Sequence, residues 1–346
     1  MKVTPYALLI NDIHVSKDNI TEFRKNWNEA LNICQQQRIP YLIIGGDLWQ
    51  SRSAQTLDTL MAVREAILKA TKQYDLNLII AEGNHCKVNQ EQYEGYSHIF
   101  SDYEYVEVVN ESARLDISDT VCLWIMSYFP ENGSFTERLK SVKSHLDSDR
   151  TNLLYIHEGI KGGLSTPSDN EVPANIFSDF DAVLVGHYHD RKKIPGTKIE
   201  YIGSSRQHNF GEDEEKGYTI LYTNGSTKFI KNEVNQRYKV IDINISEMNE
   251  DLMDMLADIK SDSRYKVKVR IKCDSTQSSS VDKAKLSECG VTKIELVTEQ
   301  TTVTNVDNSV ITQKFDKAGI KQKYTDFCLQ KSIDSQLGLY YLEKIH

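Results

Sequence analysis

The stretch Val183-Leu184-Val185-Gly186-His187-Tyr188-His189-Asp190 decides how the rest of the chain is interpreted. It begins as an unbroken apolar run rich in β-branched residues, which is typical of a strand buried on both faces. Gly186 then allows a sharp exit, and two histidines two residues apart follow it. In an extended or turning backbone this pair can converge on one point or on two nearby points. The alternative is a surface turn that carries two histidines.

Four other apolar runs also end in polar side chains. These runs, each with the polar residues that follow it, are 6–10 with Asp12 and His14, 41–44 with Asp47, 76–81 with Asn84 and His85, and 152–156 with His157. In open α/β sheets the crevice at the carboxyl ends of the strands is the usual ligand site. We therefore expect one pocket to collect these side chains together with His187 and His189.

The chemistry of this set indicates divalent metals. Carboxylate, amide and imidazole ligands together suit two first-row cations, and the imidazoles favour Mn²⁺ or Fe²⁺ over Mg²⁺. Zinc is less suitable where both sites have five or six ligands. Two metals about 3.5–4 Å apart activate a bridging hydroxide and stabilise both ends of an in-line displacement at phosphorus.

Composition places limits on the class of protein. The chain has 346 residues, which predicts about two domains, and a net charge of −9, which argues against a free-standing basic nucleic-acid binder. Its six cysteines are scattered without a C-x-x-C pair, as in a reducing compartment. The apolar run 6–10 is too short for a signal peptide or a spanning helix. We expect a cytoplasmic protein without a membrane partner, in the host cytoplasm if the source is viral.

The chain resembles the calcineurin-like metallophosphoesterases in five motifs that occur in the family's order. They are Asn11-Asp12-Ile13-His14, Gly45-Gly46-Asp47, Gly83-Asn84-His85, His157 and Gly186-His187-Tyr188-His189. Within this superfamily, the stretches 46–49 and 201–204 and the chain length resemble SbcD-type nuclease subunits of double-strand-break repair and phage recombination complexes. The resemblance implies an α/β fold, a four-layer α-β-β-α sandwich, and a DNA nuclease with two Mn²⁺ ions, or Mg²⁺ or Fe²⁺ in their place.

The resemblance also implies roles for individual residues. One metal would be held by Asp12, His14, Asp47 and His189, and the other by Asp47, Asn84, His157 and His187. Asp47 would bridge the two metals. His85 would lie over the scissile phosphate, where it stabilises the developing charge or protonates the leaving oxygen, so Asp47 and His85 are the expected catalytic residues.

Two positions depart from the family's pattern. Cys86 stands where the family has an acid after the Gly-Asn-His motif, and a thiol is a poor acceptor for orienting His85. Gln50 stands where nuclease members often have His or Asp, and its amide forms hydrogen bonds but carries no proton. Both changes bear on rate and exonuclease preference more than on metal binding.

Several polar residues that follow the motifs are candidates for contacts with DNA. They are Lys17, Gln50, Arg52, Arg191, Arg206 and His208. Basic side chains at the rim of such a site position a nucleic-acid backbone. The alternative is ordinary solvated surface charge.

The pattern predicts four parts, which are a nuclease domain over 1–235, a cap domain over 236–298, a linker over 299–318 and a helical tail over 319–346. Within the first part, 199–202, 217–222 and 227–231 are expected as antiparallel strands. The cap has a β-α-β-α-β order and resembles the small α+β domain that selects DNA in SbcD-type nucleases. In that family the tail binds an SMC-like ATPase subunit of the SbcC type, and the alternative is a tail folded onto its own domain. The family also implies a homodimer through helices near 54–72 and 90–101.

Three functions remain open at this stage. The first is the DNA nuclease, with duplex exonuclease and single-strand endonuclease activities, acting in recombination, repair or replication. The second is a stand-alone phosphoesterase for a small substrate, against which the cap and tail argue. The third is a catalytically weakened scaffold that recruits the ATPase, and its support comes from Cys86 and Gln50.

Overall fold

The structure is a computed structural model, which describes residues 2–131, 133–164, 171–274, 276–298, 317–331, 334–336 and 338–339. Its strands are β1 (Pro5–Ile10), β2 (Tyr41–Gly45), β3 (Asn77–Ala81), β4 (Val106–Val109), β5 (Ser112–Ser118), β6 (Val121–Met126), β7 (Thr151–His157), β8 (Ala182–Gly186), β9 (Lys192–Lys193), β10 (Ile199–Tyr201), β11 (Gly217–Tyr222), β12 (Thr227–Lys231), β13 (Arg237–Asn244), β14 (Tyr265–Cys273) and β15 (Val291–Thr298). The helices are α1 (Ile20–Gln37), α2 (Leu57–Gln73), α3 (Ser134–Lys143), α4 (Glu250–Ser261), α5 (Lys283–Glu288) and α7 (Lys317–Gln330), and short 3₁₀ turns connect several elements.

The first sheet has the strand order β12-β11-β1-β2-β3-β4. Strands β1 to β4 are parallel to their neighbours, so their carboxyl ends lie at one edge, while β11 is antiparallel to β1. Helices α1 and α2 pack on this sheet through apolar residues at helical spacing, such as Phe23, Trp27 and Leu31. Thr56 caps α2 by accepting a hydrogen bond from Thr59 N at 3.3 Å.

The second sheet has the order β5-β6-β7-β8-β10-β9. Strands β6, β7 and β8 are parallel, and β10 is parallel to β8. The expectation of antiparallel strands is confirmed for 217–222 and 227–231, which form β11 and β12, but Ile199–Tyr201 lies in the second sheet and is parallel to β8. The reason is the two-residue strand β9, which runs antiparallel to β10 and reverses the chain once more before β10 begins. A strand of two lysines has no apolar pattern that sequence reasoning could detect.

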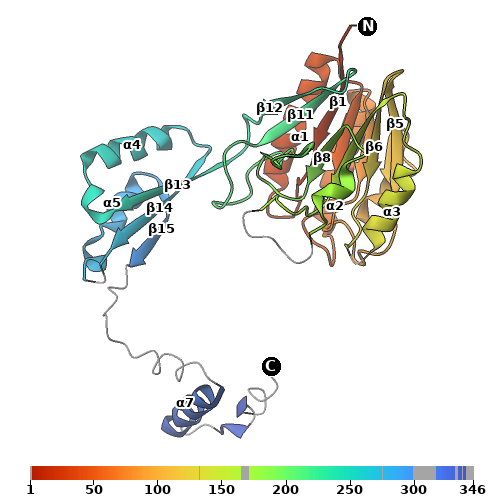
Figure 1. Cartoon of the computed structure of the whole chain (residues 1–346). Helices are drawn as coiled ribbons and strands as arrows, with labels where there is room; N and C mark the ends of the chain where they lie inside the picture. The colour runs from red at the N-terminus through yellow and green to blue at the C-terminus, as the bar shows by residue number, and fades with distance from the viewer. Residues whose placement is uncertain are drawn as a thin grey trace. The chain divides into compact units, whose positions relative to one another are not determined.

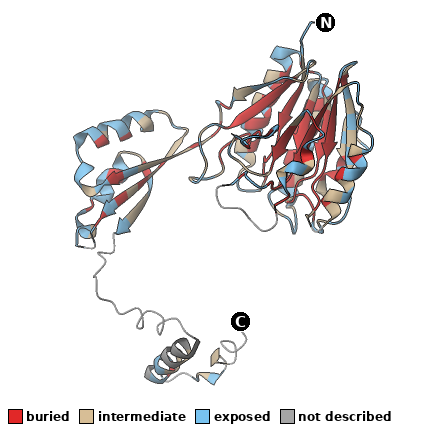
Figure 2. Ribbon diagram, viewed as in Figure 1, coloured by how far each residue is buried: buried red, intermediate tan, exposed pale blue. Residues whose placement is uncertain are grey.

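Three separate apolar clusters show that the two sheets lie between layers of helix. One cluster lies between the first sheet and helices α1 and α2, a second between the second sheet and the segment of α3, and a third between the two sheets. The order of layers is the predicted α-β-β-α sandwich (Figure 1). Buried residues concentrate along the strands of both sheets (Figure 2).

Tyr155 of β7 fixes how the two sheets meet. Its side chain is fully buried and its hydroxyl donates to Asn11 Oδ1 at 2.8 Å, just beyond β1. Gly45 at the end of β2 makes room for it, because a Cβ there would lie 2.0 Å from the Tyr155 ring. Only glycine permits this approach, so the carboxyl ends of β1, β2 and β7 come together.

A separate three-stranded sheet, β13-β14-β15, carries the later part of the chain together with α4 and α5. Asn249 caps α4 by accepting from Leu252 N at 3.0 Å. Backbone contacts divide the chain into two compact units, Met1–Ile271 with Asp282–Glu295, and Lys272–Val281 with Leu296–His346. The predicted domain boundaries stay predictions.

The predicted linker and tail fall largely outside the described residues. In the predicted linker, the structure does not describe residues 299–316. In the predicted tail, it describes α7 and a few residues up to 339. Among the described helices, none has the length and apolar character needed to cross a membrane.

Candidate metal centre

The structure brings the seven predicted metal ligands together at the carboxyl ends of strands from both sheets. Asp12 and His14 follow β1, Asp47 follows β2, Asn84 follows β3, His157 ends β7, and His187 and His189 follow β8. Contacts between neighbouring side chains connect all seven. We refer to Asp12, His14 and His189 as the first ligand group, and to Asn84, His157 and His187 as the second.

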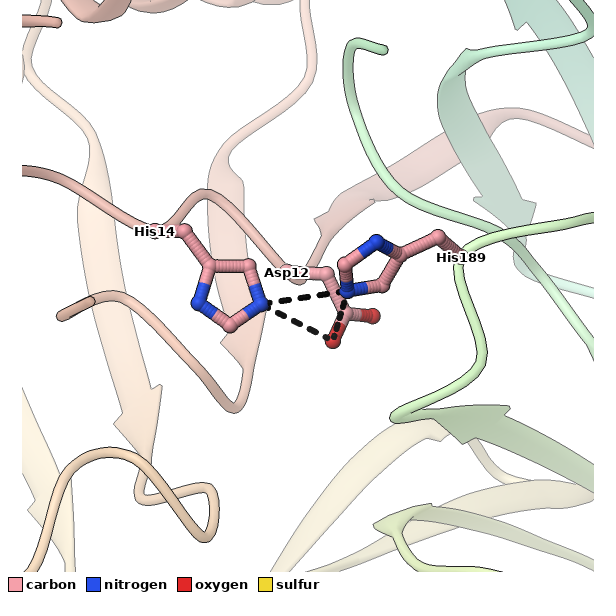
Figure 3. A group of neighbouring side chains, drawn as sticks. All are labelled: Asp12, His14 and His189. Atoms are coloured by element: carbon pink, nitrogen blue, oxygen red, sulfur yellow. Dashed lines mark hydrogen bonds and ion pairs between the residues drawn. The ribbon is translucent and has the colours of Figure 1, made fainter. Parts of the chain in front are cut away.

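The first ligand group is compact (Figure 3). The Nε2 atoms of His14 and His189 lie 3.2 Å apart, and they lie 3.9 and 3.8 Å from Asp12 Oδ1. Asp12 is fully buried, and its carboxylate accepts hydrogen bonds from the backbone N–H of His187 at 3.1 and 3.2 Å. Asn11 also donates to this carboxylate and fixes its orientation.

The second ligand group meets at the Asn84 amide. That amide lies 3.2 Å from His157 Nε2, 3.1 Å from Asp47 Oδ2 and 3.3 Å from His187 Nδ1. With its nitrogen facing Asp47 and His157, the amide donates to both, and its oxygen accepts from Arg52. The Asn84 amide thus contacts both imidazoles of the second group and the Asp47 carboxylate.

Asp47 lies between the two groups. Its Oδ2 is 3.6 Å from His14 Nε2 and 3.3 Å from His157 Nε2, while its Oδ1 accepts from the backbone N–H of His85 at 2.8 Å. Gly83 leaves space for this carboxylate, because a Cβ at Gly83 would lie 2.2 Å from Asp47 Oδ1. One carboxylate thus contacts ligands from both sheets.

The backbone at the centre is strained. Asp12, His14, Asp47 and His187 have φ angles of 50°, 51°, 49° and 94°, in the left-handed region that non-glycine residues rarely adopt. Such angles cost about 1–3 kcal/mol each and persist where surrounding contacts hold them. Hydrogen bonds from Asp12 N to Gly46 O and from His14 N to Asp47 O, at 3.1 and 2.9 Å, hold the first two.

Burial and the neighbouring charges shift the pKa values of these groups in opposite directions. Burial lowers the pKa of His14 to about 4 and that of His187 to about 4. For His157, burial lowers the pKa, but the Asp47 and Asp12 carboxylates outweigh it and raise the pKa to about 9. For Asp47 the effect of burial is outweighed by His157, so its pKa lies well below its ordinary value.

These residues fit divalent cations. Three sets of side chains have ligand atoms within 4.8 Å of one another, namely Asp12 with His14 and His189, His14 with Asp47 and His85, and Asp12 with Asp47 and His157. Carboxylate and imidazole acceptors face each other here with few donors between them. The repulsion between these acceptors is removed when they bind a divalent cation. The buried Nδ1 of His14 also has no hydrogen-bond partner among the described residues.

His85 lies at the mouth of the centre and is half-buried. Its Nδ1–H donates to the main-chain carbonyl of Gln50 at 2.7 Å, which leaves Nε2 free. This carbonyl orients His85 in place of the acid that the family has at position 86. Cys86 is fully buried, with its sulfur 4.0 Å from Asp47 Oδ1, and burial raises the pKa of its thiol well above the ordinary value.

The predicted DNA contacts fall into two sets. Lys17, Gln50 and Arg52 are exposed. Arg191, Arg206 and His208 are at least partly buried and bonded within the protein: Arg191 to Glu200 and Thr219, Arg206 to Ile13 O, and His208 to Asp12 O. Their contact with DNA stays a prediction, and the donors of the first set are the ones open to solvent.

Among the residues that sequence reasoning missed, Glu212 and Asn11 bond side chains of the centre directly. Glu212 accepts from His189 Nδ1 at 2.8 Å, and Asn11 bonds both Asp12 and the carbonyl of Gly203. Asn11 belongs to the first motif, but the sequence alone assigns it no role in binding or orienting a ligand. Glu212 lies 23 residues beyond His189 in an acidic stretch, where no spacing distinguishes it from its neighbours.

Buried carboxylates and imidazoles that converge where two facing sheets meet define a metal-dependent hydrolase. A model of the calcineurin-like phosphoesterase family matches residues 6–191, more than half of the chain, and the chain belongs to this dimetal-dependent family.

Solved structures with a similar fold include three from different organisms. A dimetal phosphatase from Danio rerio has 10% identity and a TM-score of 0.44, covering 63% of this chain and 93% of its own. GAP50, the anchor in the inner membrane complex of Plasmodium, has 11% identity and a TM-score of 0.48, with 67% and 85% covered. The nuclease MPE of Pseudomonas putida has 14% identity and a TM-score of 0.29, with 63% and 84% covered. At these values the matches carry no inference about function.

Proposed function

We propose that this chain is a DNA nuclease of the SbcD type that uses two Mn²⁺ ions to hydrolyse phosphodiester bonds. The observation that carries the proposal is the position of Asp47, whose carboxylate contacts His14 on one side and His157 on the other. A shared carboxylate between two ligand groups suits a pair of metals bound to one phosphate. The family supports the hydrolysis of phosphoesters, and the nucleic-acid substrate is our proposal.

Two divalent cations, when bound, supply Lewis acidity and a hydroxide nucleophile at neutral pH. The first ligand group and Asp47 would hold one of them, and the second group and Asp47 the other. His85 has its Nδ1–H bonded to Gln50 O, so its Nε2 points away from this contact. In the imidazolium form, which also carries a proton on Nε2, it can donate to a phosphate oxygen or protonate the leaving oxygen. The backbone N–H of His85 also holds the Asp47 carboxylate in the orientation that contacts both ligand groups.

A cavity of about 420 Å³ opens beside His187 and His189, and Leu164, Tyr188 and Lys192 contribute to its wall. This volume lies within the range of small-molecule pockets, so it accommodates a small phosphoester as well as one unit of a polymer. Lys17 and Arg52 are exposed near the motifs and can contact backbone phosphates.

We further propose that the nuclease acts in the cytoplasm as the catalytic subunit of an ATPase–nuclease complex in DNA recombination, repair or replication. The tail would bind an SMC-like ATPase subunit of the SbcC type. A homodimer would form through α2 and the segment 90–101. Leu57, Met61 and Ile99 support this surface, because their side chains are 72%, 43% and 57% exposed.

The test compares three substrates with Mn²⁺ and with a chelator. A linear duplex labelled at each end, a single-stranded circle and bis-p-nitrophenyl phosphate report exonuclease, endonuclease and simple esterase activity. We expect metal-dependent cleavage of both DNAs. Hydrolysis of the small ester alone would establish a stand-alone phosphoesterase instead. Failure to cut any substrate, with or without the ATPase subunit, would favour the scaffold.

A further inference from the structure

The loop between β10 and β11, residues 202–216, contacts the backbone of the first motif. Three consecutive carbonyls of that motif accept hydrogen bonds from it. They are Asn11 O from Ser205 N at 3.3 Å, Asp12 O from His208 Nε2 at 2.8 Å, and Ile13 O from Arg206 Nη2 at 3.1 Å. Asp12 and His14, at φ angles of 50° and 51°, lie on either side of Ile13. The loop therefore holds the strained segment that presents two of the predicted ligands.

The same loop also contacts the third member of the first ligand group. Glu212 Oε1 accepts from His189 Nδ1 at 2.8 Å and from Asn209 Nδ2 at 2.9 Å, while Oε2 accepts from His208 N at 3.0 Å. The Glu212 side chain is 8% exposed. Since a carboxylate is an acceptor only, the proton lies on His189 Nδ1, and the lone pair of Nε2 points towards Asp12 and His14.

A buried lysine holds this arrangement in place. Lys216 Nζ is fully buried and donates to the His189 carbonyl at 2.8 Å and to Asp213 at 3.0 Å, and it also pairs with Asp190. The backbone on both sides of the Glu212–His189 contact is thereby linked through one ammonium group. The contact is built into the loop and does not depend on a flexible surface side chain.

We propose that Glu212 is a positioning residue for the metal bound by the first ligand group, and that Arg206 and His208 belong to the same support. Hydrogen bonding of a ligating imidazole to a carboxylate fixes its tautomer and raises its basicity as a ligand. Glu212 thus acts through His189, and Arg206 and His208 act through the backbone of Asp12 and Ile13. The proposal rests on metal binding by this chain and not on its substrate.

The experiment measures metal and tautomer without any nucleic acid. Mn²⁺ binding to the full chain is followed by electron paramagnetic resonance, and ¹⁵N–¹H correlation spectra of the metal-free protein report the His189 tautomer. We expect wild type to bind two Mn²⁺. Glu212→Ala should weaken one site by about 10- to 100-fold and leave the other unchanged. Glu212→Gln keeps an acceptor, so it should keep the tautomer and weaken that site less.

A second variant identifies which site is affected. His157→Ala should remove the metal of the second group, and Glu212→Ala in that background should weaken the one site that remains. Glu215→Ala is the matched control on the same loop, because Glu215 is exposed and pairs with Lys231 at 2.7 Å, away from the ligands.

Unchanged affinity at both sites in Glu212→Ala, or equal loss at both, would overturn the proposal. If Glu212→Ala does not fold, Glu212→Gln decides, because it must then weaken one site alone while His189 keeps its Nδ1–H tautomer. None of these outcomes depends on nuclease activity, so a failed cleavage assay leaves this result standing.

Discussion

The two ligand groups of the metal centre are held by different kinds of contact. In the first group, the Glu212 carboxylate accepts from His189 Nδ1 at 2.8 Å, and the surrounding loop binds the backbone carbonyls of the first motif. In the second, the partner of His157 Nδ1 is the main-chain carbonyl of Gly45 at 3.3 Å. A carboxylate makes an imidazole a stronger ligand than a neutral carbonyl does. We therefore expect the first group to bind its cation more tightly.

The second group also differs in containing a neutral amide. The Asn84 amide lies 3.2, 3.1 and 3.3 Å from His157, Asp47 and His187, but it carries no charge, whereas the first group contains the Asp12 carboxylate. The two halves of the centre therefore differ in charge and in the partners of their imidazoles, although the same carboxylate, Asp47, serves both.

The largest effect is expected for Asp47→Ala, which removes what the two groups share. Both metal sites should be lost, and hydrolysis should fall by at least about 10³-fold, because the cations contribute several kcal/mol to the barrier. Mn²⁺ titration and a cleavage assay check this. Retention of one tight site in the variant would show that Asp47 belongs to a single group and would remove the basis for a shared carboxylate.

A smaller effect, without loss of metal, is expected for His85→Ala. Its side chain contacts Gln50 O, and its free Nε2 is placed to act on the phosphate or the leaving group. Loss of a general acid typically costs about 10²–10⁴ in rate. Both ligand groups should keep their Mn²⁺ affinity in the same titration. A loss of metal that matches the loss of rate would instead make His85 a ligand.

The convergence of the seven side chains of the centre could be predicted, because each lies at or just beyond the end of a strand. Asp47 follows β2, which is parallel to β1 in the first sheet, and His157 ends β7, which is parallel to β8 in the second sheet. Within each sheet, parallel strands bring their carboxyl ends to one edge. Gly46 precedes Asp47 and Gly83 precedes Asn84 for a steric reason, because a side chain at Gly46 would meet His157 and one at Gly83 would meet Asp47.

The contacts of Arg206, His208 and Glu212 could not be predicted, because they depend on the path of the loop between β10 and β11, which is distant in sequence from the first motif. Arg206 and His208 have the composition of a basic rim, and their burial against the first motif follows from contacts across 193 and 196 residues of sequence. Glu212 is one of several acids in a row, and its partner is set by the path from β10 to β11. The direction of β10 was missed for the same reason, since β9 is too short to leave a pattern.

Gly46→Ala places a side chain directly against His157 of the second group. Gly46 has a φ of +114°, and a Cβ there would lie 2.3 Å from His157 Nδ1. Gly196→Ala is the control, because Gly196 has a φ of +73° with nothing within 4 Å of the added carbon. Backbone strain should destabilise both variants by about 1–3 kcal/mol in thermal unfolding.

In Gly46→Ala, the displacement of His157 should also weaken the second Mn²⁺ site by about 10-fold or more, as expected for a disturbed ligand. Gly196→Ala should bind both metals as wild type does. A uniform loss at both sites in Gly46→Ala would indicate that the two groups are not separable in the way the contacts suggest.

The smallest effect is expected for Gln50→Ala. This variant tests whether the main-chain carbonyl of residue 50 is sufficient to orient His85 when neither position 50 nor position 86 carries an acid. Gln50 orients His85 through its main-chain carbonyl, and this atom is unchanged by the substitution. The Gln50 side chain is exposed. Cleavage should therefore fall by less than about 3-fold, in contrast to His85→Ala, because the carbonyl that orients His85 is retained and a 3-fold change corresponds to less than about 1 kcal/mol in the barrier. Metal affinity should stay the same in both groups. A loss comparable to that of His85→Ala would show that the amide itself contacts the substrate, and the backbone orientation of His85 would then not be sufficient for its role.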